Sequence, residues 1–168
     1  MKGMFVYVRL ETAPRQWLTH CLGNPVVFPS HSYENALLIR MLTKRPAGVS
    51  PLNEGTDPKC VPILIPDSSS KPSEYYNYLG RRGHELLVSA IDDLFRLALW
   101  SECSSSLYQG GVNKAIDEWC ERNGIELDAR EAVRQKFYRM RKKYQTTGII
   151  LGNFYKKHYH NTGKKRTP

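Results

Sequence analysis

The stretch DAREAVRQKFYRMRKKYQ, residues 128–145, has the spacing of an amphipathic helix and is the strongest indication of the fold. Its apolar residues recur at steps of three and four, which predicts that one face of the helix is buried. Asp128 followed by Glu131 is a capping-box pattern and indicates where the helix begins. The residues of the predicted buried face are Val133, Phe137, Met140 and Tyr144.

Two helical patterns precede this stretch, and a hairpin pattern follows it. Residues 112–123 carry a short apolar stripe that ends before Gly124, a residue suited to the left-handed stop of a helix. Residues 84–101 carry a longer apolar stripe at helical spacing. Beyond residue 148, two apolar runs flank a Gly-Asn pair, a pattern that favours a β-hairpin. The residues predicted to be buried in the longer stripe are Leu86, Leu87, Ala90, Ile91, Leu94, Leu97 and Ala98, widened by Phe95 and Trp100.

Residues 1–72 show a mixed pattern instead. Residues 4–10 and 61–65 are rich in β-branched and apolar types and predict strands, with Pro62 expected at an edge or a strand start. Helices are predicted between them, and the polar residues 67–72 suggest a domain boundary. The predicted fold class is therefore α+β: a small mixed α/β module at 1–72, and at 73–168 a three-helix bundle with a C-terminal β-hairpin.

Positive charge is concentrated at the C-terminal end of the chain. Residues 130–168 hold twelve Lys and Arg against a single acid, Glu131, whereas residues 1–129 hold thirteen against fifteen. These net charges of +11 and −2 together give the +9 of the whole chain. Clustered cations attract polyphosphates, and counterion release favours their binding to nucleic acid. The basic end is thus predicted to bind nucleic acid; the alternative is a solvated tail that assists solubility.

The order of three helices and a hairpin resembles the winged helix-turn-helix class over residues 84–158. In that class the helix after the turn lies in the major groove of DNA and the hairpin is a wing that touches neighbouring phosphates. The resemblance implies that residues 129–145 form the recognition helix and that duplex DNA is favoured over RNA. RNA stays an alternative, because aromatic residues beside cations suit stacking on unpaired bases. The residues expected to contact nucleic acid are Arg130, Arg134, Tyr138, Arg139, Arg141, Lys142, Lys156 and Lys157.

No catalytic residue, metal site or cofactor is predicted. The His-Tyr-His motif at 158–160 matches the metal-binding element of certain nucleases, which would make a tyrosine of 75–78 the nucleophile, but it adjoins a basic tail without a nearby carboxylate. Ser68-x-x-Lys71 fits a penicillin-binding motif by letter only. The cysteines form no Cys-x-x-Cys pair of the kind found in zinc ribbons, and they are Cys21, Cys60, Cys103 and Cys120.

The N-terminal residues lack the apolar core of a secretory signal, and no run approaches the roughly 20 apolar residues of a membrane span. We therefore expect a cytoplasmic protein without a membrane partner. The predicted function is DNA binding without enzymatic activity, as a transcriptional regulator or as an accessory factor of replication or of a mobile element. The alternatives are an assembly protein whose basic end binds RNA or an acidic partner, and the metal-dependent nuclease. Residues 1–72 are expected to hold a second copy or a protein partner through their edge-like strand.

Overall fold

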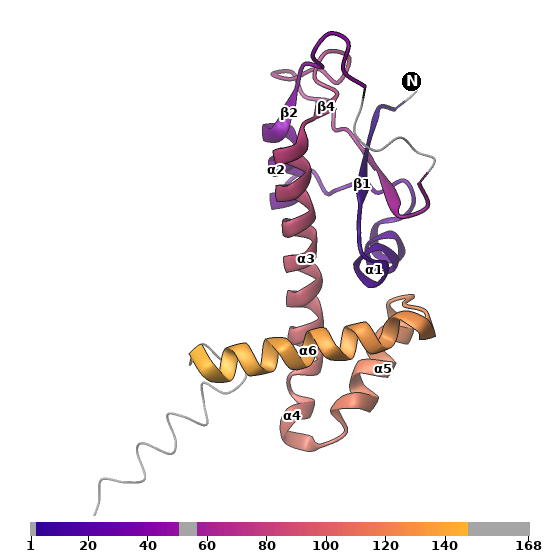
Figure 1. Ribbon diagram of the computed structural model, residues 1–168, viewed down its shortest axis with the longest axis vertical. Helices are drawn as coiled ribbons and strands as arrows, with labels where there is room; N and C mark the ends of the chain where they lie inside the picture. Colours follow the sequence, from indigo (N-terminus) through magenta and orange to yellow (C-terminus); the bar gives the residue numbers. More distant parts are fainter. Residues whose placement is uncertain (1–2, 51–56, 148–168) are drawn as a thin grey trace, which may run out of the picture.

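A long helix, α3 (Arg81–Cys103), runs through both halves of the molecule and organises the fold (Figure 1). The computed structural model describes residues 3–50 and 57–147. Around the beginning of α3 lie β1 (Phe5–Arg9), α1 (Thr12–Leu22), α2 (Tyr33–Met41), β2 (Leu42–Thr43), β3 (Cys60–Leu64) and β4 (Tyr78–Leu79). Around its end lie α4 (Ser106–Gln109), α5 (Val112–Arg122) and α6 (Leu127–Thr147). The predicted α+β class is confirmed; the predicted hairpin falls outside the described residues.

The strand predicted at 61–65 forms as β3 of a two-stranded sheet, with Pro62 in its middle and not at its start. On one side β3 pairs antiparallel with β1, with Tyr7 opposite Pro62. On the other side a single bridge forms: the backbone N–H of Val26 donates to the Pro62 carbonyl and the Leu64 N–H donates to the Val26 carbonyl, both at 2.9 Å. Neither bridge bond needs an N–H from Pro62, so proline is tolerated at this position.

Lys71 stabilises the end of α2, a role that no sequence pattern predicted. The helix begins after Ser32, whose hydroxyl accepts a hydrogen bond from the Asn35 N–H at 3.1 Å, as expected for a serine cap. It ends at Met41, where the chain turns into β2. The Lys71 ammonium donates to three carbonyls at this end, those of Ile39, Arg40 and Leu42, at 2.8 to 3.0 Å. This ammonium is therefore a structural cap.

The buried apolar residues form two clusters that share α3. The first joins the strands, α2 and the early part of α3 through Ile91, and the second joins the later part of α3 from Phe95 onward with α5 and α6. Trp17 of α1 packs against both. The change from one cluster to the other thus occurs within α3, between Ile91 and Phe95. The domain boundary at residue 72 stays a prediction.

The buried face of α3 is rotated relative to the predicted stripe. Leu86 and Leu97, both expected to be buried, are 38% and 57% exposed. Apolar residues occur on several sides of this helix, so its neighbours decide which of them are covered. The buried residues of α3 are Gly83, His84, Leu87, Ile91, Phe95, Leu99, Trp100 and Cys103. None of the helices within 3–50 and 57–147 is both long and apolar enough to cross a bilayer.

Candidate nucleic-acid interface

The turn between α5 and α6 is set by Gly124 and by a contact from α1. Gly124 has φ +67°, and a Cβ atom there would lie 2.6 Å from Nδ1 of His20, so the predicted glycine stop is confirmed. The predicted capping box is wrong, because α6 begins at Leu127 and Asp128 already lies in its first turn. Instead, the side chain of Gln16 on α1 holds Glu126, the residue that precedes α6. The side-chain oxygen of Gln16 accepts from the Glu126 N–H at 3.1 Å, and its side-chain nitrogen donates to the Glu126 carboxylate at 2.9 Å.

The buried face of α6 is the one that the periodicity predicted. Val133 and Phe137 are fully buried and Met140 is nearly so, while Tyr144 packs against the same cluster. The Phe137 ring stacks on Trp100 of α3, with centroids 5.2 Å apart, and Tyr144 meets the same indole edge-on at 4.8 Å. Figure 1 shows α6 crossing the lower part of α3. The helix is thus anchored along its length, which holds its outer face in a defined position.

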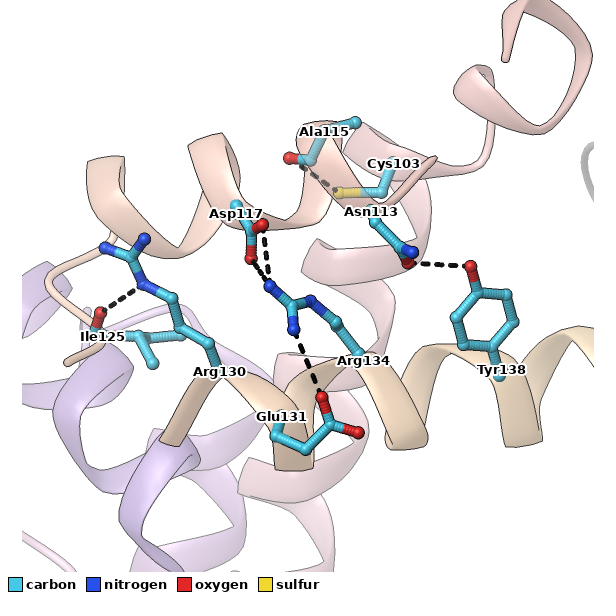
Figure 2. Close-up of polar contacts among 9 residues, drawn as sticks. All are labelled: Cys103, Asn113, Ala115, Asp117, Ile125, Arg130, Glu131, Arg134 and Tyr138. Atoms are coloured by element: carbon cyan, nitrogen blue, oxygen red, sulfur yellow. Dashed lines mark hydrogen bonds and ion pairs between the residues drawn. The ribbon is translucent and has the colours of Figure 1, made fainter. Parts of the chain in front are cut away.

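Arg134 is occupied by acids of the protein itself. Its guanidinium donates to both carboxylate oxygens of Asp117 on α5, at 2.6 and 2.8 Å, and to Glu131 at 3.2 Å (Figure 2). Hydrogen bonds donated to the Asp117 carboxylate raise the pKa of the Arg134 side chain above its already high ordinary value. The side chain is only 32% exposed. Arg134 therefore ties α6 to α5, a bidentate role for which arginine is well suited.

Two other expected contact residues also have partners within the bundle (Figure 2). The Tyr138 hydroxyl donates to the Asn113 side chain on α5 at 2.8 Å, although the residue is 39% exposed. Arg130 donates through Nε to the Ile125 carbonyl at 3.5 Å and is half-buried. The stripe of Arg130, Arg134 and Tyr138 thus runs along the border with α5 instead of lying at the centre of the exposed face.

Lys136 makes a tertiary contact that sequence reasoning missed. Its side chain is 18% exposed and pairs with Asp92 of α3, and with Glu11 at 3.3 Å. The ammonium also lies 5.4 Å from the centroid of the Phe95 ring. Asp92 in turn pairs with Arg96, one turn further along α3, at 2.6 Å. The network joins α6, α3 and the residue that precedes α1. No local signal marks Lys136, because its acids lie 44 and 125 positions away.

The remaining cations of α6 point outward. Arg139, Lys142 and Lys143 are exposed and Arg141 is half-buried. Within residues 3–50 and 57–147, no ion pair or side-chain hydrogen bond engages their charged groups. Arg139 and Lys142 line a shallow hollow of about 350 Å³ together with Gln135 and Tyr138. These four positions lie at helical spacing on one side of α6, which we call the outer row: Gln135, Tyr138, Arg139 and Lys142. Lys156 and Lys157, the expected wing contacts, lie outside the described residues.

Metal-ligating side chains do not gather in the described part of the chain. Within 3–50 and 57–147 no group of three or more His, Cys, Asp or Glu is placed to hold a metal ion. Burial raises the pKa of the Cys103 thiol to about 12 and that of the Cys120 thiol to about 11, so both stay protonated at neutral pH. The histidines at 158 and 160 lie outside the described residues.

Comparison with known proteins finds no matching family model, no similar curated protein and no similar solved structure. The functional argument therefore depends on the geometry of the chain itself.

Proposed function

We propose that this chain is a non-enzymatic DNA-binding protein that places the outer row of α6 against a duplex. One observation carries the proposal: α6 is anchored by Phe137 on one face, and its opposite face carries exposed cations that are not neutralised by acids of the described residues. A fixed helix with unpaired cations is suited to a phosphate-lined groove, because it loses little conformational entropy when it binds. A transcriptional regulator or an accessory factor of replication or of a mobile element would use such a helix.

The chemistry of the outer row supports duplex recognition. An α-helix fits the major groove, where arginine recognises guanine and glutamine recognises adenine through paired hydrogen bonds. Arg139 and Gln135 supply these two groups one turn apart, and Lys142 supplies a phosphate contact one turn further on. Because Asp117 occupies Arg134, we propose Gln135 and Arg139 on the outer row as the base contacts in its place.

The element order supports the resemblance to the winged helix-turn-helix class as part of this proposal. Helices α3, α5 and α6 pack around one apolar cluster, and four residues separate α5 from α6. We also propose a cytoplasmic location. All four cysteines lie in the described part of the chain and are free thiols, which suits a reducing compartment.

The test is a binding series with the variant Arg139→Gln/Lys142→Gln. A fluorescent duplex DNA, a single strand and a duplex RNA of the same sequence are titrated by anisotropy at 50, 100 and 200 mM salt. Loss of the Lys142 phosphate contact makes the slope of log affinity against log salt for the duplex shallower by about 1, and loss of the Arg139 base contact weakens duplex binding by about 1 to 3 kcal/mol. The matched control is Lys114→Gln/Arg122→Gln, which removes the same charge from exposed positions on α5.

Duplex binding that is equal in the parent and the Arg139→Gln/Lys142→Gln variant would refute the proposal. The same holds if the α5 control loses as much affinity as the α6 variant, because the effect would then come from net charge alone. Stronger binding to the RNA duplex or the single strand than to duplex DNA would mean that the outer row recognises RNA or single strands, and not duplex DNA.

A further inference from the structure

An open cleft separates α6 from the N-terminal module at the junction of β1 and α1. Its volume is about 710 Å³. The cleft is lined on one side by α6 from Asp128 to Arg139 and on the other by residues 9–14 and Lys59. These segments are far apart in the sequence and lie next to one another only because α6 and the N-terminal module both pack against α3.

Three cations from different elements stand around this cleft with side chains open to solvent. Arg9 ends β1 and its side chain is 60% exposed, with one carboxylate contact, to Asp57 at 3.8 Å. Lys59 immediately precedes β3 and is exposed, and its ammonium has no ion pair within the described ranges. Arg139 completes the set from α6. A contact at 3.8 Å between exposed groups is weak, so all three cations are available to an incoming anion.

The remaining charges of the cleft show where an anion is accepted and where it is not. Lys136 also lines the cleft, but Asp92 and Glu11 neutralise it. Glu11 is 80% exposed, and Asp128, which also lines the cleft, is exposed too, so both charges act against an anion near them. The cleft therefore attracts anions at its rim, where Arg9, Lys59 and Arg139 lie, and less so near Glu11.

The cleft is continuous with the outer row of α6. Gln135 and Arg139 line both the cleft and the shallow hollow that also contains Tyr138 and Lys142. A phosphate chain lying along α6 would thus pass Arg139 on its way to Arg9 and Lys59. A single small anion would gain nothing from this continuity, whereas a polyanion would contact both surfaces at once.

We propose that the cleft is a second phosphate-binding site, in which Arg9 and Lys59 hold the backbone of the same nucleic acid that occupies the outer row. The inference rests on the proposed function and gives the N-terminal module a role in it. The ligand at the cleft is a phosphodiester segment of the bound strand.

The test compares Arg9→Gln/Lys59→Gln with the parent in binding to a 20-base-pair duplex. Two lost phosphate contacts make the salt slope shallower by about 2 and lower affinity at 100 mM salt by about ten- to sixty-fold. The matched control, Arg81→Gln/Arg82→Gln, removes two exposed charges from the start of α3, outside the cleft. A second variant, Glu11→Gln, removes one opposing acid from the cleft and one of the two acids that pair with Lys136, and it is expected to raise affinity at least two-fold.

The outcomes separate the two proposals. If Arg139→Gln/Lys142→Gln weakens binding but Arg9→Gln/Lys59→Gln and Glu11→Gln both leave it unchanged, the cleft is not a binding site and the α6 proposal stands. If the Arg81→Gln/Arg82→Gln control weakens binding as much as Arg9→Gln/Lys59→Gln, the effect is general electrostatics and the cleft proposal fails. If none of the variants changes duplex binding, both proposals fail together.

Discussion

Truncation of Phe137 tests whether α6 is a rigidly held helix. The side chain is fully buried, stacks on Trp100 at 5.2 Å and meets Tyr138 edge-on at 6.0 Å. Phe137→Ala removes a buried ring and leaves a cavity, a change that lowers the free energy of unfolding by about 3 to 5 kcal/mol. Because the contacts between rings are lost as well, we expect a loss near the upper end, about 4 to 5 kcal/mol. A folded chain of this kind has only about 5 to 15 kcal/mol of stability, so the variant is expected to be marginally folded.

The assay is urea unfolding followed by tryptophan fluorescence, since Trp17, Trp100 and Trp119 all contact the second cluster. With a slope of about 2 kcal/mol per molar urea, the midpoint should fall by about 2 M for Phe137→Ala. Phe137→Leu keeps most of the volume and should lose about 1 to 1.5 kcal/mol, which keeps the test informative if the alanine variant does not fold. Arg139→Ala, on the outer row, should change stability by no more than about 0.5 kcal/mol.

A shift of less than about 0.5 M for Phe137→Ala, or equal shifts for Phe137→Ala and Arg139→Ala, would refute this account of α6. The helix would then not depend on the stacked rings, and its outer face would not be held in place.

Two further predictions concern stability. Asp92→Asn should lower the free energy of unfolding by about 2 kcal/mol, because the largely buried Lys136 charge then keeps only the exposed Glu11 as a partner. Lys136→Met should lower it by less, because Asp92 still pairs with Arg96. A larger loss for Lys136→Met than for Asp92→Asn in urea unfolding would contradict this network. Burial raises the pKa of Cys103 to about 12 and that of Cys120 to about 11, from 9.0. Above pH 9 the folded state therefore holds more protons than the unfolded state, and stability falls as pH rises until the folded pKa of each thiol is reached. Cys103→Ala/Cys120→Ala should flatten this decline between pH 9 and 11, and an unchanged decline would show that the thiols do not cause it.

Several features of the fold were predictable because they depend on neighbours in the sequence. The buried stripe of α6 follows from the 3.6-residue period of a helix. Gly124 marks a helix end because glycine, unlike residues with a Cβ atom, adopts a positive φ without strain. The contact of Asp92 with Arg96 follows from their spacing of one turn. The strand at 61–65 was recognised from its apolar, β-branched residues.

The errors have a common cause. The capping box at Asp128 was replaced by a contact from Gln16, 110 positions away from Glu126. The exposure of Leu97 could not be read from its spacing, because the neighbours that cover α3 come from separate parts of the chain.

By itself, the sequence determined where helices form, which face of α6 is apolar and that positive charge gathers beyond residue 129. Only the tertiary structure decided which of these cations are available to a ligand. Arg134 and Arg139 look alike in the sequence, but Arg134 faces Asp117 on α5 while Arg139 faces outward. Helix periodicity is a local property of the backbone, whereas the partner of a charged side chain depends on which distant segment the packing brings beside it.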